Sequence, residues 1–467
     1  MNESNTLLRV DRLKVRNFRC FSECSLELHP TLTVLVADNA LGKTALLDGL
    51  RLALNVFVTA MIRSKQCRGL EQSDIHLIRD KEGQMQPQLP TLFSAEGCID
   101  GEMIKWARAL KSNGLRARSS TNGTKAIRAV VQRILGRMDD RGDTRISPLP
   151  ILPLVAFYGT GRLWDERRLT EGKRWHASAS PVRVSAYLDC LSPSSSYKSF
   201  VAWYEQTAEA VRDPRFKVAG RDERPESAIA AVREAVRSVL GPTGWTTIDW
   251  QFAPKNSVGQ PQGRGFVVVE HSENGRLPLS HLSDGVRNMV ALVADLTHRC
   301  VQLNPHLGEA AARLTPGIVM IDEVDMHLHP RWQQLVVGLL QATFPKMQLV
   351  LSTHSPHVLS TVDFSSVRVI HLANGLGEVT KPDFQTLGDE SADVLARVME
   401  VDPIPKVESA RLLSHYRSLV QNNQDNSGSA REIWSQLLGH FGADHHLLQE
   451  AAVLRRLQEF KRENGLG

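Results

Sequence analysis

The chain has 467 residues, more than one hydrophobic core usually holds, and this length predicts two or three domains. Hydrophobic residues make up 42% and charged residues 23%, which is typical of globular proteins and argues against a largely disordered or fibrous chain. Lysine and arginine number 56 against 51 acidic residues, so the net charge of +5 does not by itself predict a polyanionic partner.

Two further features concern the compartment. The most apolar segment, residues 46–62, is interrupted by Asp48, Arg51 and Asn55, so we expect no membrane-spanning helix. The first residues lack the pattern of a secretion signal, and the six cysteines have neither paired nor zinc-binding spacing. We therefore expect a cytoplasmic protein with reduced thiols.

The first elements form a strand, loop and helix. Strands are expected near residues 13–18 and 26–28 and over the apolar run 32–36, and a helix over residues 45–62. The loop between contains Gly42, Lys43 and Thr44. Such a loop presents backbone N–H groups and the positive helix end to phosphate, with lysine reaching the β- and γ-phosphates and threonine at a Mg²⁺ position. Ala37 stands where the usual GxxxxGK[ST] pattern has its first glycine.

Residues 63–262 have mixed character, with a strand expected at 153–158 and helices at 197–211 and 226–240. Because no heptads run through them, they predict a compact inserted lobe and not a coiled-coil arm. Eleven basic residues between positions 105 and 145 face only three aspartates. This segment either follows a phosphate backbone or is a solvated face. Glu71, Gln72 and Asp74 are candidate Mg²⁺ contacts. Arg162 either contacts phosphate, couples the insertion to the nucleotide or lies in an ordinary turn.

Apolar strands return in residues 263–380. A β-rich run at 266–270 precedes LSDG at 282–285 and a helical pattern, and the strands 318–321 and 348–351 enclose helical spacing at 332–340. A strand at 367–372 and a turn at 374–375 follow. Residues 1–62 and 263–380 therefore predict two halves of one α/β sheet that are separated in sequence. The tail, residues 381–467, has apolar positions at helical spacing.

Chemical groups follow these strands. Asp322 and Glu323 end the strand at 318–321, where α/β sheets bind ligands, so we expect Asp322 to hold Mg²⁺ and Glu323 to act as general base. His354 follows the next strand and is expected to contact the γ-phosphate or the attacking water. Ser283 and Gly285 at a helix N-terminus form a second anion site, which predicts a dimer, although Ser283 is also compatible with a simple helix cap.

These motifs, GKT at 42–44, LSDG at 282–285, VMIDE at 319–323 and STHSP at 352–356, resemble those of the ABC-type ATPase heads of the RecF and OLD group. The chain is more closely similar to the Septu and retron ATPase family, through YGTGR at 158–162, LSDGVRNMVALVADL at 282–296 and DEVDMHLHP at 322–330. The resemblance implies an α/β P-loop ATPase head with a mixed insertion lobe and a helical C-terminal region. The tail, with its several apolar faces, either docks on the head or on a nuclease, or only completes the head.

The resemblance also implies the ligands and partners. ATP and Mg²⁺ are the expected cofactors, and the expected nucleotide-binding residues are Asn39, Gly42, Lys43, Thr44 and Ala45, with Ser283 and Gly285 acting from a second copy. A separate HNH nuclease in anti-phage defence is the expected partner; DNA, or a reverse transcriptase with its DNA product, is a further one. Two alternatives stay open, a RecF-like DNA-repair ATPase and a scaffold that binds ATP with negligible turnover, which Ala37 motivates.

Overall fold

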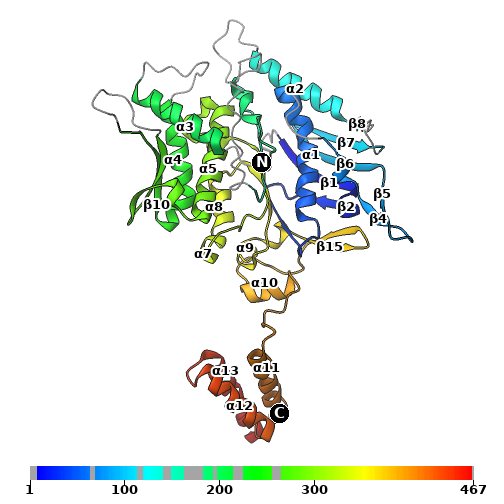
Figure 1. Cartoon of the computed structure of the whole chain (residues 1–467), viewed down its shortest axis with the longest axis vertical. Helices are drawn as coiled ribbons and strands as arrows, with labels where there is room; N and C mark the ends of the chain where they lie inside the picture. Colours follow the sequence, from blue (N-terminus) through cyan, green and yellow to red (C-terminus); the bar gives the residue numbers. More distant parts are fainter. Residues whose placement is uncertain are drawn as a thin grey trace. The chain divides into compact units, whose positions relative to one another are not determined.

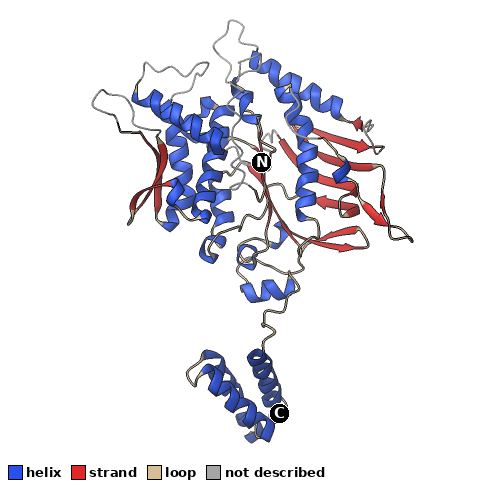
Figure 2. Cartoon of the chain, viewed as in Figure 1, coloured by secondary structure: helices blue, strands red, loops and turns tan. Residues whose placement is uncertain are grey.

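The computed structural model describes residues 8–63, 69–112, 119–139, 149–161, 182–192, 197–213, 225–254 and 265–464. The chain divides into two compact units, Met1–Val394 and Leu395–Gly467. The first unit contains a large mixed sheet with helices packed beside it, and the second is helical (Figures 1 and 2).

One sheet of eleven strands organises the first unit, in the order β8-β7-β6-β1-β2-β16-β15-β3-β14-β13-β9. The strands are β1 (Leu8–Phe18), β2 (Phe21–Glu27), β3 (Leu32–Val36), β6 (Thr91–Ile99), β7 (Glu102–Leu110), β8 (Ser119–Asn122), β9 (Leu154–Tyr158), β13 (Gly317–Ile321), β14 (Met347–Ser352), β15 (Val367–Ala373) and β16 (Leu376–Thr380).

The parallel part of this sheet contains β15, β3, β14, β13 and β9. Every residue of β3, β9, β13 and β14 is buried, as expected for strands covered on both faces. Strand β3 belongs to the first segment of the chain, yet it lies between β14 and β15, which come more than 300 residues later. The prediction of one α/β sheet assembled from distant segments is therefore confirmed. The carboxyl ends of β3, β14 and β13 meet at one edge.

The antiparallel part joins β2, β1, β6, β7 and β8. Buried and more exposed residues alternate along β6, so one face packs inward and the other meets solvent. Strands β6 to β9 come from the segment 63–262, which therefore extends the sheet at both ends. A separate two-stranded sheet, β4 (Leu77–Arg79) and β5 (Met85–Pro87), precedes them.

Helix α1 (Lys43–Ile62) packs against β1, β6 and α2 (Thr124–Asp139). Among the described helices, α1 is long and apolar enough to cross a membrane, but 83% of that window is buried inside the protein. Its buried polar residues are paired: Arg51 Nη2 lies 2.7 Å from Asp48 Oδ1. These are properties of a core helix.

A second group of helices contains α3 (Tyr197–Arg212), α4 (Pro225–Leu240) and α5 (Asp284–Leu303), with α6 (Ala311–Leu314) beside α5. A three-stranded sheet of β10 (Trp245–Gln251), β11 (Phe266–His271) and β12 (Gly275–Pro278) packs against α3 and α4.

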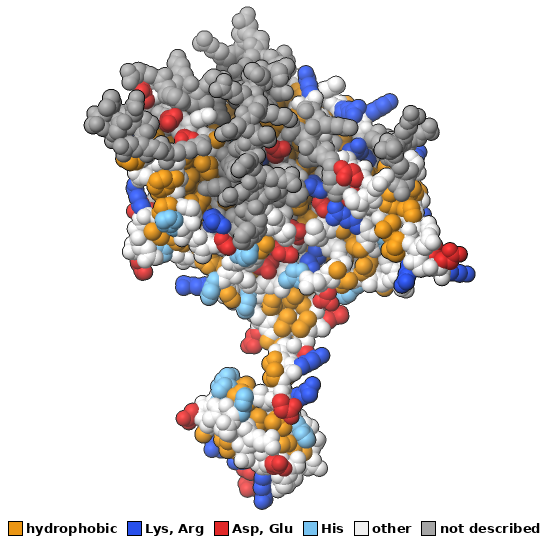
Figure 3. All heavy atoms as spheres, viewed as in Figure 1, with side chains coloured by type: hydrophobic (Ala, Val, Ile, Leu, Met, Phe, Trp, Pro, Cys, Tyr) orange, Lys and Arg blue, Asp and Glu red, His pale blue; other side chains and the backbone are white. Residues whose placement is uncertain are grey.

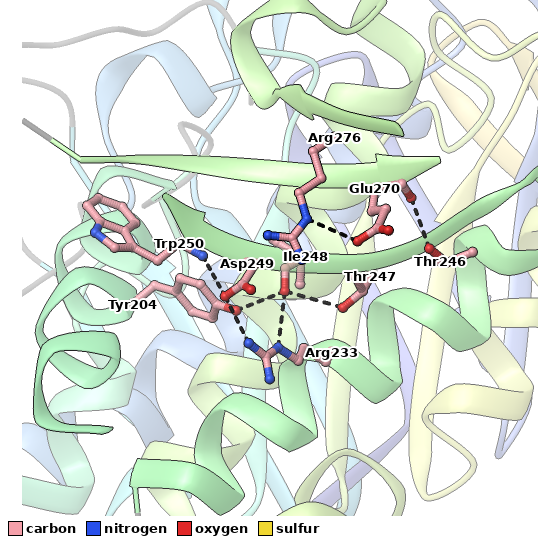
Figure 4. A network of polar contacts seen from close by, with 9 residues as sticks. All are labelled: Tyr204, Arg233, Thr246, Thr247, Ile248, Asp249, Trp250, Glu270 and Arg276. Atoms are coloured by element: carbon pink, nitrogen blue, oxygen red, sulfur yellow. Dashed lines mark hydrogen bonds and ion pairs between the residues drawn. The ribbon is translucent and has the colours of Figure 1, made fainter. Parts of the chain in front are cut away.

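Polar contacts fix this small sheet to its helices (Figure 4). The Tyr204 hydroxyl of α3 and Arg233 Nε of α4 both donate to the Ile248 carbonyl of β10, at 3.1 and 3.4 Å. Arg233 Nη2 also donates to Asp249 Oδ1 at 2.8 Å. The strand is thus held by both helices at one point.

The helical spacing at 332–340 does not form one helix. Two helices occur there, α7 (Pro330–Gln333) and α8 (Val336–Thr343), separated by a turn in which the Leu335 N–H donates to the Trp332 carbonyl, three residues earlier, at 3.0 Å. The short α9 (Pro356–Leu359) follows β14.

The end of the chain is helical, as predicted, with α10 (Ser391–Arg397), α11 (Glu408–Gln421), α12 (Gly428–Phe441) and α13 (His446–Glu463). The last three form a bundle around Tyr416, Val420, Leu437 and Leu448. Helix α12 was not among the predicted helices. On the face of this unit that Figure 3 shows, apolar, charged and histidine side chains are interspersed.

Candidate functional site

The loop between β3 and α1 is shaped by Gly42. This residue caps α1 with φ 95°, a left-handed conformation that favours glycine. A Cβ atom at Gly42 would lie 2.3 Å from Phe21 Cζ and 2.6 Å from Cys20 Sγ, so the β1–β2 turn also leaves no space for a side chain. The loop therefore needs glycine here for two reasons.

The alanines of the loop differ in conformation. Among the described residues with positive φ are Ala40, at 66°, and Gly42, but Ala37 is not one of them. Alanine in place of the first glycine of the pattern would be costly only at a positive φ, so Ala37 is not a reason for a defective loop. The strained residue is Ala40, at a cost of about 1–2 kcal/mol for an L-residue. Asn39 is exposed on the same loop.

Helix α1 begins with the side chains that the sequence singles out. Lys43 is buried, and its Nζ donates to the carbonyls of Ala37 at 2.6 Å and Asp38 at 3.2 Å. Thr44 Oγ1 donates to Asp322 Oδ2 at 2.9 Å. Ala45 is buried in the first turn. The loop and the end of β13 thus form one site.

Charges converge on the lysine of this site. Burial lowers the pKa of the Lys43 ammonium. Nearby carboxylates oppose this shift, namely those of Asp322, Glu323, Asp38 and Asp325. A lysine near several carboxylates suits a polyphosphate that binds together with a divalent cation. The divalent cation offsets the negative charge of the carboxylates and the phosphates.

The turn after β13 carries Glu323 in an unusual conformation. Its φ is 47°, and that of His327 is 62°. The Glu323 N–H donates to the Ser352 hydroxyl at 2.8 Å, so the neighbouring strand supports this turn. His354 lies half-buried just beyond β14, at the same sheet edge as Glu323. The structure therefore brings the predicted base and the predicted histidine to one edge.

Two hydroxyls that the sequence analysis did not assign donate to acids of the turn after β13. Ser352 Oγ donates to Asp322 Oδ1 at 2.5 Å, and Thr353 Oγ1 donates to Asp325 Oδ1 at 2.6 Å. The available signal was the Ser-Thr pair directly before His354, at the end of an apolar strand.

The LSDG segment begins α5. Ser283 occupies the N-cap position, but its exposed side chain makes no capping hydrogen bond. A simple Ser cap is therefore not what this hydroxyl provides. A Cβ atom at Gly285 would lie 2.3 Å from the His327 carbonyl oxygen, so glycine lets α5 approach the turn after β13 within one chain. This packing is a structural reason for Gly285, independent of any nucleotide.

Helix α5 is also joined to the sheet by a buried carboxylate that sequence reasoning missed. Asp295 Oδ2 accepts hydrogen bonds from the Tyr158 hydroxyl at 2.7 Å and from Arg299 Nε at 3.0 Å. The Tyr158 carbonyl accepts the Asp322 N–H at 2.8 Å. One tyrosine therefore links the LSDG helix to the strand end that carries Asp322.

The segment with Glu71, Gln72 and Asp74 forms a single 3₁₀ turn. Asp74 is fully buried, and its carboxylate accepts from Arg19 Nε at 3.2 Å and from the Glu71 N–H at 3.1 Å. Because both oxygens are used within the chain, Asp74 is a poor candidate for a Mg²⁺ contact. Arg162 lies outside the described residues.

A magnesium ion suits the donors at this edge. Thr44 and Asp322 offer a hydroxyl and a carboxylate, the hard oxygen ligands that Mg²⁺ prefers, and Mg²⁺ at nucleotide sites takes its other ligands from water and phosphates. No group of three His, Cys, Asp or Glu side chains in the described ranges could hold a metal ion.

The basic segment 105–145 is partly neutralised. Surface ion pairs join Lys105 to Glu96, Arg133 to Glu102 and Arg137 to Asp100. Four of its arginines, at positions 116, 118, 141 and 145, lie outside the described residues. The paired side chains favour the solvated-face interpretation for that part of the segment.

Comparisons with known proteins agree with these motifs. The family model described as "AAA domain, putative AbiEii toxin, Type IV TA system" matches residues 144–360, and a model described as "AAA domain" matches residues 12–206.

Curated relatives extend over most of the chain. The chain is 24% identical to "Retron Vc95 probable ATPase" of Vibrio cholerae serotype O1 biovar El Tor, covering 92% of this chain and 87% of that protein. It is also 24% identical to "Retron Ec83 probable ATPase" of Escherichia coli, covering 95% and 86%. "Septu protein PtuA" of Bacillus thuringiensis is 27% identical over 28% of this chain and 29% of its own length. The resemblance to the retron and Septu ATPases is confirmed.

Solved structures with similarity include "SMC head domain from Thermotoga maritima", at 14% identity and a TM-score of 0.43, covering 80% of this chain and 100% of that one. The α/β fold class rests on the sheet topology itself, with parallel strands β3, β14 and β13 ending beside a GKT loop.

Proposed function

We propose that this relative of the retron and Septu ATPases is a Mg²⁺-dependent, slowly hydrolysing ATPase of a Septu-like anti-phage system, located in the cytoplasm. The observation that carries the proposal is the convergence of Lys43, Thr44 and Asp322 at one sheet edge, with Thr44 Oγ1 2.9 Å from Asp322 Oδ2. The retron relatives are named as probable ATPases over almost the whole length of this chain.

Each residue has a distinct task in this proposal. The loop N–H groups and Lys43 bind the β- and γ-phosphates. Thr44 and Asp322 hold Mg²⁺, which supplies charge neutralisation at the transferred phosphoryl group. Glu323 accepts the proton of the attacking water, and His354 contacts the γ-phosphate side of the site.

Self-association completes the site. The N-terminus of the 20-residue helix α5 presents backbone N–H groups, and the Ser283 hydroxyl is not used for capping. We propose that Ser283 and Gly285 bind the triphosphate held by a second copy, so that ATP is buried between two chains.

The partner is proposed to be a separate HNH nuclease whose activity the nucleotide state controls, with the helical C-terminal region, residues 381–467, as the docking segment. DNA, or a reverse transcriptase with its DNA product, is a further proposed partner. In the proposed division of the chain, residues 1–62 and 263–380 are the two halves of the ATPase head, and residues 63–262 are the insertion between them. "Septu protein PtuA" of Bacillus thuringiensis aligns with only 28% of this chain, so the partner rests on resemblance.

Neither alternative has a specific structural observation in its favour. The scaffold without turnover was motivated by Ala37, which does not adopt a positive φ. The DNA-repair ATPase shares the same ATP-binding motifs, and among the basic side chains that could contact DNA, Arg133 and Arg137 are paired with acids.

The test is ATP turnover by the purified full-length chain. The proposal expects hydrolysis that requires Mg²⁺ and disappears in Lys43→Ala. Turnover that is equal in wild type and Lys43→Ala would assign the activity to a contaminant and contradict the proposal.

A further inference from the structure

The buried hydroxyl of Ser352 contacts the carboxylate of Asp322, the proposed metal ligand, and the backbone N–H of Glu323, the proposed base. Strands β13 and β14 are parallel, with Ile321 opposite Leu351, so the next residues, Asp322 and Ser352, lie side by side. Ser352 has no exposed surface. Its Oγ donates to Asp322 Oδ1 at 2.5 Å and accepts the Glu323 N–H at 2.8 Å.

The polarity of these two bonds is fixed by chemistry. An N–H group can only donate, so the Ser352 oxygen accepts from Glu323, and the one hydroxyl hydrogen goes to the Asp322 carboxylate. Thr44 Oγ1 donates to the other carboxylate oxygen, Oδ2. Each oxygen of Asp322 thus receives a hydroxyl hydrogen, which sets the plane of the carboxylate.

The backbone around Glu323 is held by the same serine. A φ of 47° costs an L-residue about 1–2 kcal/mol, so Glu323 keeps it only because neighbouring groups hold it. Ser352 Oγ binds the Glu323 N–H, and the Ser352 carbonyl accepts the Val324 N–H at 3.0 Å. Ser352 therefore contacts three consecutive residues, 322 to 324.

The adjacent hydroxyls have other partners. Thr353 Oγ1 donates to Asp325, and Ser355 Oγ donates to Gln333 Oε1 at 2.7 Å. The hydroxyls at the end of β14 therefore bind different groups, and among these three it is Ser352 that contacts both Asp322, the proposed metal ligand, and Glu323, the proposed base.

We infer that Ser352 is a positioning residue for ATP hydrolysis, an inference that rests on the proposed function. Its hydroxyl orients the Asp322 carboxylate toward the metal position, and it holds the strained backbone from which the Glu323 side chain projects. The substrate itself is bound by other groups, the loop and Lys43. Removing the hydroxyl should therefore impair metal use and turnover while leaving metal-free ATP binding unchanged.

The test compares Ser352→Ala and Ser352→Thr with Ser360→Ala in the full-length chain. Ser360 is a matched control because its hydroxyl donates only to a backbone carbonyl, that of His357, at 3.0 Å. For Ser352→Ala we expect kcat to fall about 10–100-fold, the usual effect of losing an outer-shell partner of a metal ligand. Ser352→Thr, which keeps a hydroxyl, should recover most of kcat, and Ser360→Ala should match wild type.

A binding measurement makes the test independent of turnover. ATP affinity is measured by titration calorimetry in EDTA and in Mg²⁺ for each variant. Ser352→Ala should bind ATP like wild type in EDTA but lose most of the gain in affinity that Mg²⁺ provides. Its melting temperature should lie within a few degrees of that of Ser360→Ala.

Two results would overturn the inference: a Ser352→Ala variant with wild-type kcat and wild-type Mg²⁺ gain, or one that loses metal-free ATP binding and thermal stability together, which indicates a purely structural role. If the wild-type chain itself shows no turnover that Lys43→Ala abolishes, the proposed function fails and this inference fails with it. A wild-type chain that hydrolyses ATP beside an equally active Ser352→Ala rejects the inference alone.

Discussion

Thr44 and Asp322, 278 positions apart in the chain, are joined by a hydrogen bond of 2.9 Å. The bond connects the first turn of α1, which follows β3, with the end of β13, and β14 lies between β3 and β13 in the sheet. It places the GKT loop beside the Asp-Glu pair, the arrangement on which the proposed binding of a nucleoside triphosphate and Mg²⁺ rests.

Replacing Glu323 by glutamine should separate ATP binding from hydrolysis. The amide keeps the size of the side chain but cannot accept a proton, so kcat should fall about 10²–10⁴-fold while ATP affinity stays unchanged. Steady-state ATP hydrolysis measures kcat, and equilibrium titration measures ATP affinity. Wild-type kcat in Glu323→Gln would remove this residue from the base role.

ATP should drive self-association through α5. In Glu323→Gln with Mg²⁺ and ATP, sedimentation velocity should reveal a larger species that is absent without nucleotide. Adding Ser283→Arg, a bulky cation at the exposed helix start, should abolish this species but preserve ATP binding. Ser272→Arg, in the exposed turn after β11, is the control that should still associate. Monomers at saturating ATP in the parent variant would contradict the two-chain site.

Cys20 should report occupancy of the loop. Its sulfur lies 2.6 Å from where a Cβ on Gly42 would be, and burial raises the pKa of its thiol. Alkylation should therefore be slow near neutral pH and faster as pH rises, because the thiolate is the reactive form. Saturating ATP should slow it further.

The half-exposed Cys98 serves as internal control for this labelling, in a Cys67→Ser background because Cys67 lies outside the described residues. Peptide mass spectrometry with a maleimide measures both sites. Equal rates at Cys20 with and without ATP, in protein shown to bind ATP, would place the nucleotide elsewhere.

Tyr158→Phe should destabilise the first unit. The variant leaves Asp295, a buried carboxylate, without one donor, and we expect a loss of about 1–3 kcal/mol in unfolding free energy. Tyr204→Phe removes a bond to a neutral carbonyl and should cost less, about 0.5–1.5 kcal/mol. Urea unfolding at pH 8 measures both, and an equal or smaller loss in Tyr158→Phe would contradict the account.

The same tyrosine predicts a pH dependence. Burial, followed by the Asp295 charge, raises the pKa of Tyr158 well above its usual value. A raised pKa in the folded state means that the contribution to stability is complete below about pH 10 and declines as pH rises above it. The stability difference between wild type and Tyr158→Phe should therefore shrink above about pH 10.

Much of the fold was predictable because buried parallel strands are continuous apolar runs. Residues 318–321 and 349–351 are such runs, and both belong to strands that end at the predicted chemical groups. The loop–helix transition at Gly42 was equally clear, because the GKT motif, the preceding strand and the apolar helix agree.

Other features depend on pairing across the chain, which a single sequence does not reveal. The alternation along β6 predicts a half-buried strand but not that it pairs with β1. The bond between Tyr158 and Asp295 joins positions 137 apart, and the role of Ser352 appears only when β14 is aligned with β13. The roles of Ser283, Glu323 and His354 stay predictions.

The most direct test of the nucleotide site is ATP binding by Lys43→Ala, measured by titration calorimetry beside Lys346→Ala, an exposed lysine in the turn before β14. Losing a buried ammonium that binds phosphate should cost about 1.5–3 kcal/mol, a weakening of roughly 10–150-fold or more. The account predicts this loss in Lys43→Ala and wild-type affinity in Lys346→Ala. A folded Lys43→Ala protein that binds ATP as tightly as wild type would contradict it.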